Sequence, residues 1–286
     1  MKKQVNTILS AFAVASLTFA ITGCGSTNST SAANSQAAQG DTASANQLAP
    51  KDLLYQYSTI NGLIVGVDDG DMTLGELRKY GSMGLGTINA LDGEMIEMDG
   101  KFYQIDSAGK LHVLDDATKT PFAVVTNFSP TNTTTISNVK NFSDLAAKLQ
   151  SHFTKKNDFY AVKITGTFNY VKARTVPKQQ KPYPPLTVAT SHQSEFEFKN
   201  VKGTLFGFYT PKFASGINVP GWHLHFITDD KTSGGHVLDL HFDSANAQFA
   251  ELTQFQVSLP QNKDFQNVNL AGDTSKDITK AESNHK

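Results

Sequence analysis

The sequence has very little cysteine: there is a single one among 286 residues, at position 24. One thiol cannot form an intramolecular disulfide, so the fold must be stable without such bonds. An excess of charge of one sign is also missing, because 25 lysine and arginine residues stand against 26 aspartate and glutamate residues. This balance gives no electrostatic argument for binding to nucleic acid, and we do not expect nucleic acid as a partner.

The chain also lacks internal repeats and any alternation of strand and helix patterns. Their absence argues against solenoids and against doubly wound parallel sheets. A hydrophobic content of 39%, with 10% aromatic residues, is enough for a substantial core. We therefore predict a β-rich α+β fold, with mostly antiparallel or mixed sheets in two packed subdomains and few short helices.

The N-terminus carries the pattern of an export signal. Two lysines precede an apolar run over residues 8–21, and small residues then lead to Cys24. The end of this segment, Ile-Thr-Gly-Cys, resembles a bacterial lipobox, in which the cysteine is lipidated and becomes the first residue. A plain secretory signal with an incidental cysteine is the alternative. We predict a signal peptide over residues 1–23 and an exported, cell-surface lipoprotein anchored at Cys24, which touches the membrane only through its lipid.

A low-complexity segment follows the cysteine. Residues 25–50 consist mainly of serine, threonine, alanine, asparagine and glutamine. Such a composition cannot bury enough apolar surface to offset the entropy of ordering. We predict that residues 24–50 form a disordered tether, and that one folded domain occupies residues 51–286.

Local patterns predict the elements of this domain. Alternation and β-forming residues over 54–67 indicate one or two strands, and a capping-box pattern at Thr73–Glu76 predicts a short helix to about Tyr80. Asp-Gly and Ala-Gly turns divide residues 87–114 into an antiparallel meander. Helices are expected at 143–153 and 275–282, and long strands at 159–171, 196–210, 222–242 and 249–259.

Three histidines gather in the stretch GWHLHFITDDKTSGGHVLDL, residues 221–240. In a strand His223 and His225 point to one face, while Trp222 and its alternating neighbours pack on the other. The Asp- and Gly-rich turn that follows brings His236 back on a return strand. Three imidazoles without a fourth ligand in the hairpin suit an open catalytic zinc site. The alternative, surface or packing histidines, is common for an isolated His-X-His pair.

A fourth histidine lies on the predicted return strand. His241 is five positions from His236, so simple alternation points its side chain to the opposite face. We therefore expect that it is not a ligand.

Several separate stretches resemble the α-acetolactate decarboxylase family. They are GTINALDGEMIEMDGKFYQI, RTVPKQQKPYPPL and TPKFASGINVPGWHLHFITDDKTSGGHVLDL, and the resemblance extends from about Leu53 to Glu282. It implies a two-sheet fold that is commonly dimeric, so a homodimer is expected, with a zinc ion held by three histidines near carboxylates. It also implies decarboxylation of 2-acetolactate to acetoin and carbon dioxide.

The resemblance carries over to individual residues. It gives His223, His225 and His236 as the metal ligands, and it gives four catalytic residues: Glu94 of the LDGE motif, Arg174 of the RTVP motif, Thr87 upstream of LDGE, and Glu282 near the C-terminus. Without this resemblance, the local sequence also allows Glu94 to be an exposed hairpin residue and Glu282 to be a surface residue of a helix.

The chemistry of the substrate agrees with such a site. Loss of carbon dioxide from acetolactate leaves an enediolate, and zinc chelated by the hydroxyl and ketone oxygens would be its electron sink. Arg174 would hold the departing carboxylate through two parallel hydrogen bonds, and Arg174 or Glu94 would deliver the proton. Two alternatives remain open, another metal-dependent β-fold enzyme of cupin or carbonic-anhydrase type, and a non-enzymatic metal-binding surface lipoprotein.

Overall fold

The structure, a computed structural model, describes residues 49–282. The predicted signal peptide and residues 24–48 of the predicted tether therefore lie outside the described residues. Ala49 packs at the edge of the core, and the side-chain amide of Asn127 donates to its carbonyl oxygen over 3.3 Å. No helix within residues 49–282 has the length and apolar character needed to cross a membrane.

The first sheet contains seven short strands in the order β14-β1-β8-β3-β4-β5-β6. All neighbours are antiparallel except β1 and β14, so the sheet is mixed. The meander predicted over residues 87–114 is confirmed as the run from β3 to β6. The strands are β1 (Leu53–Tyr57), β3 (Met83–Thr87), β4 (Glu94–Met98), β5 (Lys101–Ile105), β6 (Leu111–Val113), β8 (Phe122–Thr126) and β14 (Gln254–Ser258), and β2 (Met72–Thr73) pairs separately with β7 (Lys119–Thr120).

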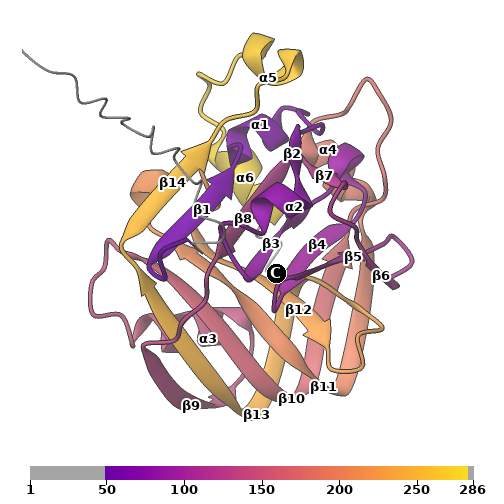
Figure 1. Ribbon diagram of the computed structural model, residues 1–286. Helices are drawn as coiled ribbons and strands as arrows, with labels where there is room; N and C mark the ends of the chain where they lie inside the picture. Colours follow the sequence, from indigo (N-terminus) through magenta and orange to yellow (C-terminus); the bar gives the residue numbers. More distant parts are fainter. Residues whose placement is uncertain (1–48, 283–286) are drawn as a thin grey trace, which may run out of the picture. The chain divides into compact units, whose positions relative to one another are not determined.

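The second sheet contains longer strands in the order β10-β11-β12-β13-β9. Because β13 also pairs with β10, four of these strands form a closed ring of pairings. Figure 1 shows the short strands of the first sheet above these long strands. The strands are β9 (Asn132–Val139), β10 (Phe159–Thr175), β11 (Ser194–Thr210), β12 (Gly221–Thr228) and β13 (Gly234–Leu252).

The helices are few and short, as predicted. They are α1 (Ile60–Ile64), α2 (Leu74–Leu77), α3 (Phe142–Gln150), α4 (Leu186–Ala189), α5 (Lys263–Asn267) and α6 (Ser275–Glu282). The Thr73–Glu76 capping box is present at the start of α2. The expectation of strand structure throughout 54–67 is wrong in its second half, because α1 occupies it. The hydroxyl of Thr59 accepts a hydrogen bond from the Gly62 amide and caps that helix.

The two sheets share one core, which explains why they pack as a unit. A single cluster contains Leu54 and Ile96 from the first sheet together with Phe206 and Ile227 from the second. Ile278 of α6 belongs to the same cluster. A second cluster lies between the ring of long strands and α3, and a third lies between the first sheet and α2. The predicted β-rich α+β class, with mostly antiparallel or mixed sheets and few short helices, is confirmed. The two predicted subdomains are instead two sheets of one compact unit, because the sheets share a core.

Candidate active site

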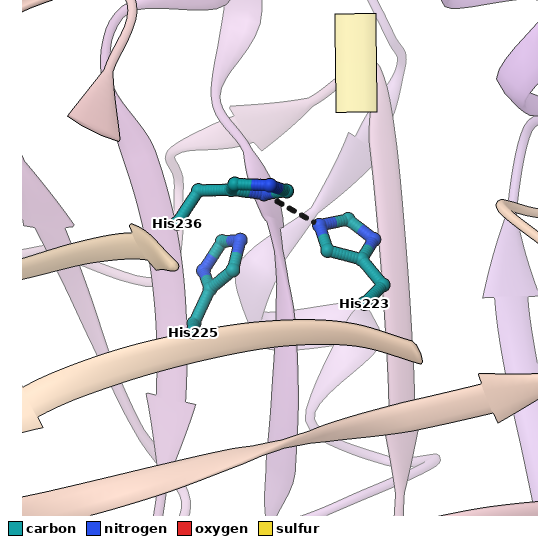
Figure 2. A group of neighbouring side chains, drawn as sticks. All are labelled: His223, His225 and His236. Carbon is teal, nitrogen blue, oxygen red and sulfur yellow. Dashed lines mark hydrogen bonds between the residues drawn. The ribbon is translucent and has the colours of Figure 1, made fainter. Parts of the chain in front are cut away.

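Three histidine side chains meet between β12 and β13. His225 stands directly opposite His236 in the pairing of these strands, and His223 is two residues away on β12. Each ring offers a nitrogen atom, and these atoms all lie within 4.8 Å of one another. His223 Nε2 and His236 Nδ1 are 3.0 Å apart, and the three rings face a common point (Figure 2).

Strand alternation places these rings together. Trp222, Leu224 and Phe226 point the other way and join the core of the second sheet. The Asp- and Gly-rich turn ends at Gly234, where β13 begins. The hairpin predicted from the sequence is therefore present, with its histidines on one face.

His241 does not belong to the histidine cluster, as predicted, but the prediction that it points to the opposite face from His236 is wrong. Ala173 on β10 pairs with Val237, whereas Lys172 pairs with Asp239, so β13 contains one extra residue at this point. The bulge changes the alternation, and His241 projects from the same face as His236. It lies exposed at a distance from the cluster and stacks on Tyr170.

Burial makes the three imidazoles suitable metal ligands. His225 is completely buried, and neither of its ring nitrogens makes a hydrogen bond. Buried polar atoms without partners are costly, which suggests that a ligand supplies the missing interaction. Burial lowers the pKa of His223 to about 3, and it lowers the pKa of His225 well below its usual value. Neutral imidazoles are the form that binds a divalent cation.

Two carboxylates reach this cluster from different elements. Glu94 begins β4, and its Oε2 lies 3.5 Å from His225 Nε2. Glu282 ends α6, and its Oε2 lies 3.8 Å from His223 Nε2 and 3.7 Å from His236 Nδ1. Both are buried, so neither is the exposed surface residue that a reading without the family allows.

Arg174 joins the two carboxylates. This residue near the end of β10 is only 3% exposed. Its Nη1 donates to Glu94 Oε1 over 2.9 Å, and its Nη2 donates to Glu282 Oε2 and to the Ala281 carbonyl oxygen, each over 3.3 Å. Both terminal nitrogens are thus engaged by the protein. The Nε atom is buried without a hydrogen-bond partner.

The pKa of Glu94 depends on its burial and on two charged neighbours, Arg174 and Glu282. Burial raises the pKa of Glu94 to about 7, although the Arg174 guanidinium opposes the shift; Glu282 adds to it. Burial also raises the pKa of Glu282, again against the influence of Arg174. A carboxyl group with a pKa near neutrality can hold a proton in the folded protein and release it on demand.

Thr87 lies beside Glu94, because the two residues pair between β3 and β4. Its hydroxyl donates to the Gly93 carbonyl oxygen over 2.7 Å. The proton of this hydroxyl is therefore committed to the backbone immediately before Glu94.

Several of these groups line a pocket with about 390 Å³ of empty space, a volume that includes the part open to solvent. The polar side chains of its lining are Thr87, Glu94, Arg174, His223 and Glu282. The apolar lining comes from side chains of separate elements that the sequence patterns do not single out, which include Ile60, Leu63, Leu91, Phe122, Val176 and Leu186. Each reads as an ordinary core residue, so no local pattern could reveal it. The pocket suits a small ligand that carries both polar and apolar groups.

Comparisons with a family model and with curated proteins identify the same family. A family model described as "Alpha-acetolactate decarboxylase" matches residues 54–272. The alpha-acetolactate decarboxylase of Brevibacillus brevis is 54% identical over 287 residues, which cover 100% of both chains. The corresponding protein of Bacillus subtilis strain 168 is 41% identical and covers 82% of this chain and 92% of its own.

Solved structures show the same fold. The crystal structure of alpha-acetolactate decarboxylase from Bacillus subtilis strain 168 has a TM-score of 0.79 at 40% identity, and covers 81% of this chain and 99% of its own. A Staphylococcus aureus protein described as similar to alpha-acetolactate decarboxylase has a TM-score of 0.77 at 33% identity, and covers 80% of this chain and 100% of its own. Glu282 lies beyond the segment matched by the family model, and its position beside Arg174 comes from the structure.

Proposed function

Because the chain belongs to the alpha-acetolactate decarboxylase family, we propose that it converts 2-acetolactate to acetoin and carbon dioxide with a bound divalent metal ion, zinc in particular. The observation that carries this proposal is the buried cluster of His223, His225 and His236 beside the Glu94–Arg174–Glu282 array. The three histidines would hold the ion.

The cluster fits such an ion by the type, burial and mutual proximity of its donor atoms. Three buried histidines as the metal-binding group found among residues 49–282 are typical of zinc sites that keep a position for substrate. Once bound, the ion would supply a Lewis acid for the substrate's oxygen atoms. None of the residues that line the pocket in the described part of the chain is a lysine, which is consistent with a reaction without an imine.

Arg174 gives the site a fixed positive charge next to the substrate pocket. Its two terminal nitrogens already hold Glu94 and Glu282, so it does not present an unoccupied fork to the substrate carboxylate. We propose instead that the guanidinium attracts the carboxylate by its charge and by its Nε hydrogen. This replaces the bidentate clamp inferred from the sequence.

Glu94 is the proton donor in this proposal. Loss of carbon dioxide leaves an electron pair on the former carboxylate-bearing carbon, and acetoin forms when that carbon takes up a proton. A guanidinium is a poor acid, whereas the Glu94 carboxyl group has a pKa of about 7 because it is buried. Glu282 would orient the histidines, and Thr87 would orient the backbone next to Glu94.

The direct test is to incubate the purified protein with racemic acetolactate and to measure acetoin and carbon dioxide. We expect both products, loss of activity after dialysis against a chelator, and recovery with zinc. His225→Ala should abolish metal binding and activity, whereas the matched control His241→Ala should retain both. Metal binding without acetoin formation would contradict the proposed reaction.

A further inference from the structure

The backbone just before Glu94 is strained. Ala90 and Leu91 have positive φ angles of 67° and 49°, and Gly93 follows with φ 81°. Side chains make this left-handed conformation costly, so two successive non-glycine residues adopt it only when their surroundings impose it. Glycine is needed at position 93 for a further reason: a Cβ atom there would lie 2.2 Å from the carbonyl oxygen of Ile105.

Two backbone hydrogen bonds to the segment after β10, a strand of the second sheet, hold this turn in place. The Gly93 amide donates to the Val176 carbonyl oxygen over 3.0 Å, and the Gln179 amide donates to the Ala90 carbonyl oxygen over 2.7 Å. Val176 and Gln179 belong to the segment that directly follows β10. The LDGE and RTVP motifs are therefore joined to each other through their backbones.

Two side chains add to these backbone bonds, one between the sheets and one within the first sheet. Thr175, next to Arg174, is completely buried, and its hydroxyl donates to the Ile105 carbonyl oxygen over 2.9 Å. Ile105 is the residue that pairs with Glu94 between β4 and β5. The side-chain amide of Gln104, also on β5, donates to the Asp92 carbonyl oxygen over 2.6 Å.

We propose that Thr175 and Gln104 are positioning residues that set the distance between Glu94 and Arg174. Thr175 ties the end of β10, which carries Arg174, to the strand paired with Glu94. Gln104 ties the strained turn that leads into Glu94 to the same strand. The inference rests on the proposed function, because it concerns the accuracy of the decarboxylation site.

The arrangement of the site makes such a brace important. Glu94 belongs to the first sheet and Arg174 to the second, yet their side chains meet over 2.9 Å. A shift of one sheet against the other would change this contact first, whereas the histidines would keep their mutual geometry because all three lie on the β12–β13 hairpin. Misplacement of catalytic groups by about 1 Å can cost on the order of 100-fold in rate.

The test compares two buried threonines with the same local role. Thr175→Val removes one hydroxyl and preserves the shape of the side chain. Thr126→Val is the matched control, because Thr126 is also completely buried and its hydroxyl donates to the Leu53 carbonyl oxygen over 2.7 Å. It lies at the other end of β8 from Phe122, which lines the pocket. Thr175→Ser restores the hydroxyl, and Gln104→Met probes the second bond.

We expect kcat for acetolactate to fall at least about tenfold in Thr175→Val and in Gln104→Met, with bound zinc unchanged. The Thr126→Val variant should lose about as much thermal stability as Thr175→Val but keep the parent kcat. The Thr175→Ser variant should recover most of the parent kcat. Equal kcat values in Thr175→Val and Thr126→Val, or no recovery in Thr175→Ser, would overturn the positioning role. An inactive parent protein would instead overturn the proposed function, and the positioning role with it.

Discussion

Arg174 is the residue that unites the contributions of the two sheets. It donates hydrogen bonds to a carboxylate on β4, to a carboxylate at the end of α6 and to the carbonyl group of Ala281. A planar guanidinium can serve acceptors in several fixed directions at once, whereas an ammonium group is a single point charge on a flexible chain. The identity of this residue therefore matters more than its charge.

Arg174→Lys is expected to reduce kcat by about 10- to 100-fold, because lysine cannot hold Glu94 and Glu282 in the same relative positions. Bound zinc should be unchanged, since the three histidines remain. Acetoin formation and metal content measure the two effects. Lys172→Arg, on the same strand, is the control and should be nearly silent. Ordinary turnover in the Arg174→Lys variant would show that the guanidinium fork has no such role.

At the scale of elements, α6 closes the site from the C-terminal side. Ile278 and Ala281 are buried in the shared core, and this anchors the helix. Its last residue is Glu282, whose backbone carbonyl oxygen also lies 3.3 Å from His236 Nε2. The helix boundaries agree with those predicted from the sequence. The packing of α6 thus brings a carboxylate near the end of the chain into a buried site.

Glu282→Gln keeps the size of the side chain and removes its negative charge from the histidine cluster. We expect zinc affinity or acetoin formation to fall by about 10- to 100-fold, with little change in melting temperature of the zinc-loaded protein. Asp277→Asn removes the same charge from the exposed side of the same helix and should have no such effect. If both variants match the parent, the carboxylate of Glu282 does not contribute to the site.

At the scale of the whole molecule, buried carboxyl groups link stability to pH. Burial raises the pKa of Asp68 to about 7 from the usual 3.8, and neighbouring Asp69 adds to the shift. The folded protein therefore holds this proton more tightly than the unfolded chain does. Unfolding releases the proton between these two pKa values, so the free energy of unfolding falls as the pH rises from about 4 to about 7.

Asp68→Asn should remove this contribution. We expect the variant to match the parent near pH 4 and to exceed its free energy of unfolding at pH 8 by up to about 4 kcal/mol. Urea denaturation at both pH values measures the difference. Asp116→Asn is a control of opposite sign, because a hydrogen bond from Arg78 lowers the pKa of Asp116. Its removal should give no gain in stability at pH 8. An unchanged difference between pH 4 and pH 8 would contradict the assignment to Asp68.

We propose that the whole protein is held at the membrane through Cys24, which lies outside the described residues. The proposal rests on the lipobox-like sequence before this single cysteine. Cys24→Ser should move the protein from the membrane fraction to the soluble fraction with acetoin formation unchanged, because a lipid would be the only anchor. Fractionation of cells that express each form measures this. Continued membrane association of the variant would indicate an uncleaved N-terminal segment.

The sequence by itself determined the features that depend on local periods and on local backbone chemistry. Alternation in a strand placed His223 and His225 on one face, with Trp222 on the other. The capping box at Thr73 correctly predicted the start of α2. The turn glycines predicted the meander, and local patterns predicted α6. In each case the deciding interactions lie within a few residues along the chain.

Only the tertiary structure decided the features that depend on contacts between distant segments. One extra residue in β13 turned His241 to the face of His236, although simple alternation indicated the opposite. The pattern over 54–67 favoured strands, yet its second half forms α1 against the shared core. The sequence predicted that both terminal nitrogens of Arg174 bind the substrate carboxylate. In the structure they donate to carboxylates of β4 and α6. Bulges, core packing and hydrogen bonds between sheets depend on the partner segment, and local sequence patterns do not specify that partner.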